Sequence, residues 1–241
     1  MVLLILSDIH ANVSALTAVF DDAKNYRIDN LILLGDHIDY GMRPNETIEL
    51  LKNPPFPIEV NIWGNHEKAI FDGDLDRFSS DRGREFSLFT SRTLNNETRE
   101  YINKEMNIQG FTEKIYNGKQ YLFIHGTLED SFWKSIFPEN AGEAYKKYDY
   151  VLSGHSHLPH YFEKYYKTDN NITRGRKKTA FINPGSVGQP RNHNPRACYA
   201  VLNTETGQIH LNNIGYDIKT EQALYGADVD SFYMNRLAEG V

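Results

Sequence analysis

Five short, mainly apolar runs, each followed by polar residues, constrain the fold of this chain more than any other feature. The runs span residues 2–6, 31–34, 58–63, 121–124 and 150–152. Short apolar runs bounded by glycine and polar residues are typical of buried strands. In α/β folds, the carboxyl ends of such strands face the ligand-binding crevice. The pattern therefore predicts an α/β fold in which side chains from distant segments meet at one edge.

A motif rich in aspartate, asparagine and histidine follows each run. The motifs are Asp8-x-His10, Gly35-Asp36-His37, Gly64-Asn65-His66-Glu67, Ile124-His125-Gly126 and Gly154-His155-Ser156-His157. Each motif alone is a weak signal, but together, at predicted strand ends, they are a strong one. Oxygen and imidazole donors in this order indicate a two-metal hydrolytic site. Because imidazole accompanies carboxylate, the donor set favours Mn, Fe, Co, Ni or Zn over Mg or Ca.

These motifs resemble those of the calcineurin-like metallophosphoesterases and, among them, the small bacterial branch similar to the YfcE phosphodiesterases. The resemblance extends from Met1 to about Leu211 and includes the segment Asn-Pro-Gly-Ser-Val-Gly-Gln-Pro-Arg at residues 183–191. It implies an α/β fold of the four-layer α/β/β/α sandwich type, with two facing mixed sheets, helices outside and metals at one edge. It says much less about the substrate.

The resemblance also implies which residues hold each ion. One ion would be held by Asp8, His10, Asp36 and His157, and the other by Asp36, Asn65, His125 and His155. Asp36 would bridge the two ions, which lie about 3.5–4 Å apart in two-metal hydrolases. Two divalent ions, two aspartates and one hydroxide leave a net positive charge that attracts phosphate. Manganese is the expected metal, with iron, nickel, cobalt or zinc as alternatives.

His66 directly follows the expected ligand Asn65. By the resemblance it would donate a proton to the leaving oxygen, a role that suits an imidazole near neutral pH. Two interpretations of Asp39 remain open at this point. It could orient His66, or it could cap a helix that begins near Pro44. The single cysteine, Cys198, has no partner that would make it a nucleophile.

Four residues are candidate substrate contacts: Arg191, His37, Tyr40 and His193. Phosphoprotein phosphatases resemble this chain in Gly-Asp-x-x-Asp but continue with Arg-Gly, whereas Tyr40 and a glycine follow Asp39 here. The phosphate-binding arginine is therefore missing at that position. Arg191 is the replacement candidate, because a guanidinium can bind phosphate with two hydrogen bonds. The alternative is a surface arginine in a turn.

The composition limits the classes of partner. With 241 residues, 40% of them hydrophobic, the chain is predicted to form a single domain over residues 1–241. A net charge of −6 argues against general binding to duplex nucleic acid or to an anionic membrane, because both need a basic surface. One cysteine fits a reducing compartment, and the N-terminal apolar run is too short for a secretory signal. We therefore expect a cytoplasmic protein.

Residues 68–110 are predicted to form a helical insertion, with helix-like stretches at 83–94 and 96–106. The segment carries Arg77, Arg82, Arg84, Arg92 and Arg99. Because it directly follows Asn65 and His66, it is expected to act as a cap over the substrate pocket. The alternative, which explains most of these arginines equally well, is that they belong to a solvent-exposed helix face.

The remaining strand-like runs are predicted to belong to the second sheet or its edges. They span residues 111–116, 120–125, 150–152, 160–165, 179–182, 197–202 and 208–213. The basic segment 167–178 is expected to be an exposed hairpin loop, which could hold distal phosphates if it reaches the pocket.

These features predict a hydrolase of phosphate esters or anhydrides that acts on a small phosphorylated substrate. A nucleotide such as a dinucleoside polyphosphate is preferred, because Tyr40, Phe71 and Phe78 lie near site motifs and could stack a base. Chance placement explains these aromatic residues equally well. Two alternatives remain: a serine/threonine phosphoprotein phosphatase, against which the missing arginine counts, and a noncatalytic metal-binding scaffold. Loss of a ligand or of His66 would have favoured the scaffold.

Overall fold

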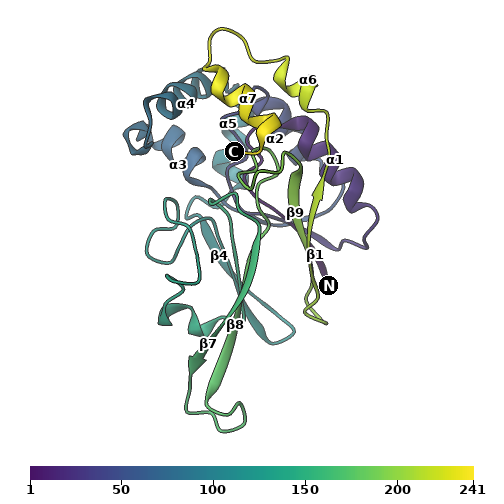
Figure 1. The fold of residues 1–241 in the computed structure, drawn as a ribbon, viewed down its shortest axis with the longest axis vertical. Coiled ribbons are helices and arrows are strands. Elements are labelled where there is room, and N and C mark those ends of the chain that lie inside the picture. The colour runs from purple at the N-terminus through teal and green to yellow at the C-terminus, as the bar shows by residue number, and fades with distance from the viewer.

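Two five-stranded sheets face each other in the computed structural model, which describes residues 1–241 (Figure 1). The first sheet has the order β10-β9-β1-β2-β3 and the second the order β4-β5-β6-β8-β7. The first contains β1 (Val2–Leu6), β2 (Asn30–Leu33), β3 (Ile58–Asn61), β9 (Ala197–Asn203) and β10 (Ile209–Ile214). The second contains β4 (Phe111–Tyr116), β5 (Lys119–Ile124), β6 (Tyr150–Ser153), β7 (His160–Lys167) and β8 (Arg176–Asn183).

Helices lie outside the two sheets. They are α1 (Val13–Ala23), α2 (Pro44–Lys52), α3 (Asn65–Asp72), η1 (Leu75–Arg77), α4 (Asp81–Thr93), α5 (Asn96–Glu105), η2 (Glu143–Lys147), α6 (Ile218–Gln222) and α7 (Ser231–Glu239). Side chains of α1, α2 and α5 form one core cluster with the outer face of the first sheet. The segment that contains η2 packs on the outer face of the second sheet. The predicted four-layer α/β/β/α sandwich is therefore confirmed.

The strand β1 shows why its sequence is continuously apolar. Leu3 and Ile5 pack between the two sheets, whereas Leu4 and Leu6 pack against the helices. Successive side chains of a strand point to opposite faces, so a strand that is covered on both faces needs apolar residues at every position. Burial of each of these side chains stabilises the fold by about 1.5–3 kcal/mol. This packing fixes where the strand ends and places Asp8 just beyond it.

Parallel pairing brings the strand ends to one edge. In the first sheet β1, β2 and β3 are parallel, and in the second β5, β6 and β8 are parallel. The loops that follow these strands carry the site motifs and the segment 184–191. The predicted convergence of the strand ends is confirmed.

Two predictions about the elements are corrected. Strands β9 and β10 do not belong to the second sheet, because β9 pairs antiparallel with β1 and β10 pairs with β9. Within the expected insertion, no residue of α5 lines the cavity beside the site motifs. Its Tyr101 and Ile102 pack into the core cluster beside α2.

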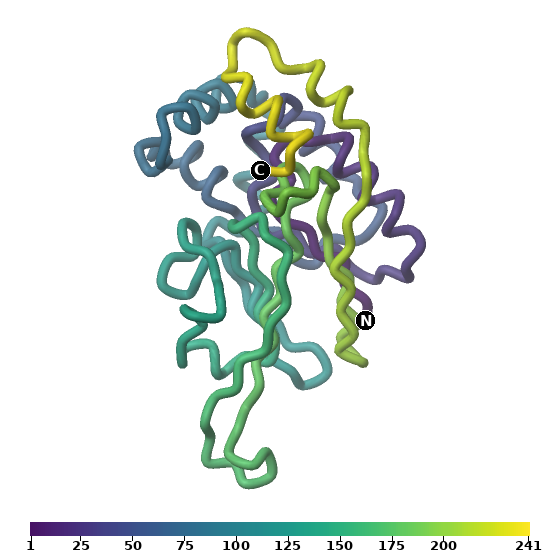
Figure 2. The backbone as a smooth tube through the Cα atoms, in the orientation of Figure 1, coloured from purple at the N-terminus to yellow at the C-terminus, as the bar shows by residue number.

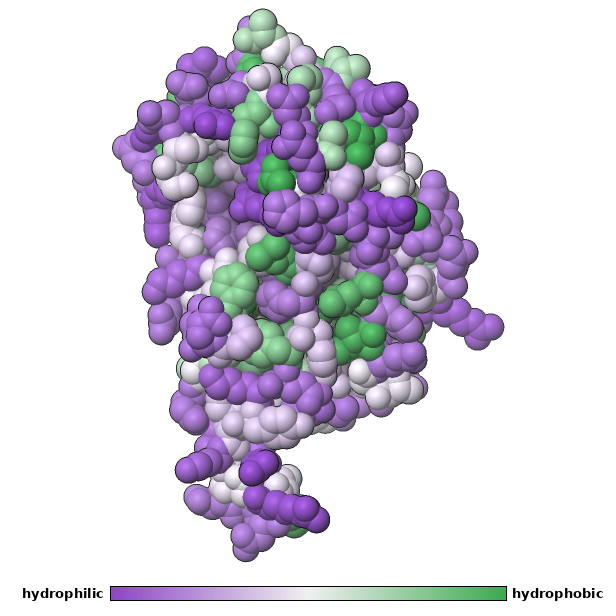
Figure 3. Space-filling model, in the orientation of Figure 1, coloured by the Kyte–Doolittle hydropathy of each residue, from purple (hydrophilic) through white to green (hydrophobic).

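The ends of the chain and one hairpin complete the shape. The C-terminal segment returns along α1 (Figure 2), where the backbone N–H of Ser14 donates to Glu221 Oε1 at 2.7 Å. The β7–β8 hairpin projects from the body, and its surface is largely hydrophilic on the face shown in Figure 3. No helix has both the length and the apolar character needed to cross a membrane.

Candidate metal centre and active site

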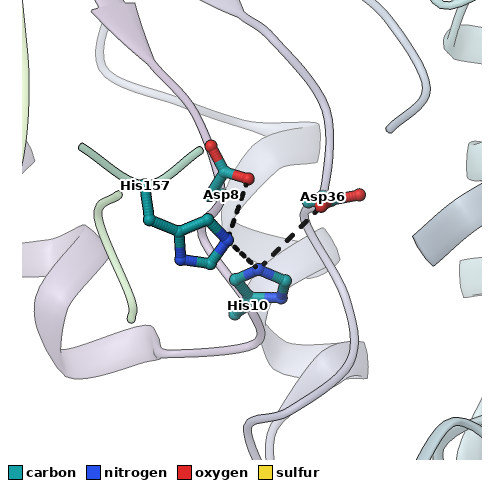
Figure 4. Close-up of side chains that lie close together, drawn as sticks. All are labelled: Asp8, His10, Asp36 and His157. Atoms are coloured by element: carbon teal, nitrogen blue, oxygen red, sulfur yellow. Dashed lines mark hydrogen bonds and ion pairs between the residues drawn. The ribbon is translucent and has the colours of Figure 1, made fainter. Parts of the chain in front are cut away.

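Four buried side chains meet where the loops after β1, β2 and β6 converge. They are Asp8, His10, Asp36 and His157, each at most 1% exposed. Ligating atoms of all four lie within 4.8 Å of one another, and the side chains surround a common centre (Figure 4). His157 Nε2 lies 3.2 Å from both Asp8 Oδ1 and His10 Nε2. Asp36 Oδ2 lies 3.9 Å from His10 Nε2.

A second group shares Asp36 with the first. Ligating atoms of Asp36, His125 and His155 lie within 4.8 Å of one another. The amide oxygen Oδ1 of Asn65 lies 3.0 Å from His125 Nε2 and 2.8 Å from His155 Nδ1. Asp36 Oδ1 accepts the backbone N–H of His66, whereas Oδ2 is 3.3 Å from His125 Nε2. The structure thus brings together every side chain that was expected to ligate metal.

The donor atoms fit metal ions because several have no other partner. Asp8 Oδ1 and Asp36 Oδ2 are buried and accept no hydrogen bond. His157 Nδ1 donates to the carbonyl of Gln189 at 2.6 Å, and His125 Nδ1 faces another backbone carbonyl at 2.7 Å. Since Nδ1 donates its proton to a carbonyl, Nε2 is the nitrogen left to ligate a metal. Carboxylate, amide and imidazole donors together suit a transition metal.

Burial and neighbouring charges set the ionisation of these imidazoles. Burial, reinforced by His125, lowers the pKa of His155 to about 4. Burial and the nearby Arg191 lower the pKa of His157. Burial would also lower the pKa of His125, but the carboxylate of Asp36 outweighs it, and the pKa rises to about 9. In the metal-free protein at pH 7, His155 and His157 are therefore neutral, whereas His125 carries a proton that a metal must displace.

Left-handed backbone conformations concentrate in the loops that carry the donors. The angle φ is 53° at Asp8, 55° at Asp36 and 60° at His157. Such conformations are unfavourable for residues with a side chain, and their clustering is typical of functional sites. Glycine is required beside them, because a Cβ atom on Gly64 would lie 2.0 Å from Asp36 Oδ1.

Glu67 connects two of these loops. Its buried carboxylate accepts the backbone N–H groups of Asp36 at 2.9 Å, His37 at 2.7 Å and Gly64 at 2.9 Å. These bonds hold the loop after β2 against the start of α3. Sequence reasoning did not predict this role, because hydrogen bonds to the backbone of a distant segment leave no local pattern.

His66 lies beside both donor groups. Its Nδ1–H donates to Asp39 Oδ2 at 2.6 Å, and its Nε2 lies 3.9 Å from Asp36 Oδ2. Asp39 does not cap α2, because the residue at that position is Arg43. Of the two interpretations of Asp39, only the orientation of His66 agrees with the geometry.

A cavity of about 380 Å³ opens over the donor groups. Its lining consists of Asp36, Tyr40, Asn65, His66, Arg77, Phe78, Ser79, Trp133, His155, His157 and Arg191. Arg191 and Tyr40, two of the expected substrate contacts, therefore face the same space as His66. The Nε of Arg191 is buried and has no hydrogen-bond partner within the protein.

Other expected contacts do not line the cavity. His37 is fully buried, and its Nε2 lies 2.8 Å from Asn61 Oδ1, outside the cavity lining. His193 is exposed and does not line the cavity. Phe71 packs against Trp63 in the core, with 5.4 Å between the ring centroids. Each of these residues is close to a motif in sequence, but its side chain lies outside the cavity lining.

Sequence reasoning also missed part of the cavity wall. Ser79 and Trp133 belong to no recognised motif, and Arg77 was expected only as one of several arginines in the insertion. The basic residues 174–178 do not line this cavity; they surround a separate one at the β7–β8 hairpin.

Comparisons with sequences of known proteins agree with this geometry. A family model for the calcineurin-like phosphoesterase superfamily domain matches residues 1–207. The uncharacterized protein MJ0912 of Methanocaldococcus jannaschii is 29% identical over 219 residues, which cover 89% of this chain and 88% of that protein.

Solved structures show the same architecture. A metallophosphoesterase from Sphaerobacter thermophilus is 29% identical, with a TM-score of 0.76 and coverage of 100% of both chains. YfcE, a phosphoesterase from E. coli, is 18% identical, with a TM-score of 0.52 and coverage of 89% of this chain and 100% of that chain. The likeness to YfcE concerns the fold.

Proposed function

The chain belongs to the calcineurin-like phosphoesterase superfamily, as its motifs predicted, and on this premise we propose that it is a dinuclear metal-dependent hydrolase of phosphate esters or anhydrides. The observation that carries the proposal is the position of Asp36. Its free Oδ2 belongs to two buried donor groups at once, which is the arrangement that a bridging carboxylate needs.

The residues of the two groups divide between the ions. Asp8, His10, Asp36 and His157 hold one ion, and Asp36, Asn65, His125 and His155 hold the other. Transition ions bound there, with manganese preferred, supply Lewis acidity and an activated water for attack on phosphorus. The complete donor set counts against a noncatalytic scaffold.

Two further side chains act on the substrate. The unpartnered Nε–H of Arg191 donates to a phosphate oxygen, and its fixed charge holds the anion in the cavity. His66 donates the proton at Nε2 to the leaving oxygen. Asp39 accepts the Nδ1–H of His66, so it fixes the direction of the ring and favours its protonated form.

The size of the cavity supports a small substrate. A volume of about 380 Å³ lies in the range of small-ligand sites. We propose a nucleotide as the substrate, with Arg191 in place of the arginine that phosphoprotein phosphatases carry after the second aspartate. The serine/threonine phosphatase remains the second candidate.

A turnover panel tests the proposal. The protein is loaded with manganese, and kcat/KM is measured for a dinucleoside polyphosphate, a nucleoside monophosphate, bis(4-nitrophenyl) phosphate and a phosphoserine peptide. We expect hydrolysis of the small substrates, abolished by a chelator and restored by manganese. Activity on none of them would contradict the enzyme assignment, and a clear preference for the peptide would favour the phosphatase.

A further inference from the structure

The cavity has an outer wall that the metal motifs do not supply. Phe78 and Trp133 meet edge to face, with ring centroids 5.4 Å apart and an interplanar angle of 81°. The guanidinium carbon of Arg77 lies 5.0 Å above the Trp133 ring. Asp130 fixes both partners, because Oδ2 accepts from Arg77 at 3.3 Å and Oδ1 accepts the backbone N–H of Trp133 at 3.0 Å. The Trp133 ring and the Arg77 guanidinium are therefore both held in place at this side of the cavity.

The cavity wall at Tyr40 is closed. Tyr40 stacks on Tyr233 of α7, with centroids 4.7 Å apart and an interplanar angle of 23°. Tyr233 is 2% exposed, so its ring fills the space behind Tyr40. A substrate that reaches the metal centre cannot extend past Tyr40. Phe78, Trp133 and Arg77 line another part of the same cavity.

Phe78 lies next to the expected proton donor. Its ring centroid is 4.9 Å from that of His66. Asp39 occupies Nδ1 of His66, so only Nε2 is available to a leaving oxygen. A leaving group that takes its proton from His66 is therefore placed beside Phe78 and extends toward Trp133 and Arg77. Arg191 lies near His157, so it contacts the phosphoryl group at the metal-binding residues and not the leaving group.

We propose that Phe78, Trp133 and Arg77 form the leaving-group subsite, and that the leaving group is a planar aromatic ring with an additional anionic group, as in a nucleoside phosphate. The ring stacks on the planar groups of the wall, and the guanidinium of Arg77 pairs with the second anion. This inference rests on the proposed phosphoesterase function. In the hydrolysis one water is consumed, and the P–O bond to the leaving group breaks as a P–O bond to the water oxygen forms. The leaving oxygen takes a proton from His66, and the proton released by the water passes to solvent, from which His66 is reprotonated.

Binding can be tested without turnover, because the chain has two tryptophans and only Trp133 lines the cavity. Trp63 is 4% exposed and lies in the core. We expect adenosine monophosphate to quench tryptophan fluorescence in a saturable way, and inorganic phosphate to leave it unchanged. Trp133→Phe should remove the quenching while the thermal midpoint stays the same. Equal quenching in the variant, or equal quenching by phosphate, would overturn the subsite.

Kinetics separate the roles of the ring and the charge. With manganese-loaded protein, Trp133→Ala should raise KM by roughly 5–100-fold for both diadenosine tetraphosphate and methyl 4-nitrophenyl phosphate, with a smaller effect on kcat. Arg77→Ala should raise KM only for diadenosine tetraphosphate, because the nitrophenyl leaving group of the other substrate has no second anion. Arg92→Ala, an exposed arginine of α4 outside the cavity, is the matched control and should change neither.

The outcomes distinguish the two proposals. If wild-type protein hydrolyses both substrates and the variants do not alter KM, the subsite is wrong while the phosphoesterase function stands. If wild-type protein hydrolyses neither, the function is wrong, and the fluorescence titration still decides whether this wall binds a nucleoside phosphate.

Discussion

His66 donates its Nδ1–H to Asp39, with 2.6 Å between nitrogen and oxygen, and this bond directs Nε2 toward the metal-binding groups. Thr90 donates to the other oxygen of Asp39 at 2.6 Å, and Ser87 also donates to the carboxylate. Both donors lie on α4. Through these hydrogen bonds, α4 positions Asp39, and Asp39 in turn positions His66. The helical segment after His66 therefore does more than cover the site.

Replacement of Asp39 should disturb catalysis but not metal binding. We expect Asp39→Asn to lower kcat by roughly 10–100-fold, because part of the general-acid contribution is lost when His66 is no longer fixed and positively polarised. Elemental analysis should show an unchanged metal content. Thr90→Val removes one hydrogen bond to the same carboxylate and should have a smaller effect. Loss of metal in Asp39→Asn would contradict the positioning role.

Removal of the proton donor should depend on the leaving group. His66→Ala should keep both metals and lose roughly 10²–10⁴-fold in kcat for an alkyl ester. The loss should shrink for a nitrophenyl ester, whose leaving oxygen needs little protonation. Parallel measurements on the two esters check this expectation. Equal losses would exclude His66 as the general acid.

Asp36 should control the metal stoichiometry. We expect two transition ions per chain after manganese addition and fewer than one in Asp36→Asn, because both donor groups lose their shared oxygen. Mass spectrometry for metals on protein purified without chelator provides the measurement. Asp72→Asn, on α3 outside both groups, is the control and should retain two ions. A wild-type stoichiometry that stays at one would remove the dinuclear assignment.

Metal affinity should rise with pH up to about 9, the pKa of His125 in the metal-free protein. Below this pH the ring carries a proton that the metal displaces, so affinity should fall by about tenfold for each unit that the pH decreases. Competition with a chromophoric chelator at several pH values between 6 and 9 measures the slope. His155, with a pKa of about 4, adds no slope in this range. A flat profile would contradict the raised pKa of His125.

Glu67 should stabilise the loops that carry the site. Glu67→Gln replaces one acceptor oxygen with a donor that faces backbone N–H groups, which should cost about 1–3 kcal/mol in the free energy of unfolding. Metal affinity should also fall in this variant, since the loop of Asp36 loses a hydrogen bond that holds it in place. Chemical denaturation of the metal-free protein gives the stability. The exposed Glu85→Gln on α4 is the control, and an equal effect in both variants would argue against the bridging role.

Local sequence signals identify the strands, their polar ends and the donor residues. Each depends on a local signal: an apolar run that is buried on both faces, such as residues 2–6, followed by a motif such as Asp8-x-His10. Parallel pairing then makes such ends converge, which is a general property of the fold. For this reason the predicted set from Asp8 to His157 lies in one cluster.

Long-range packing sets which side chains near the motifs face the cavity and which strands share a sheet. His37 adjoins Asp36 yet turns to Asn61, because the backbone at Asp36 is left-handed and Glu67 holds the next N–H. Strand β9 joins β1, Trp133 lines the cavity from a segment without a motif, and Tyr233 packs behind Tyr40. Sheet membership and side-chain direction depend on contacts between residues far apart in the chain, and no local periodicity encodes those contacts.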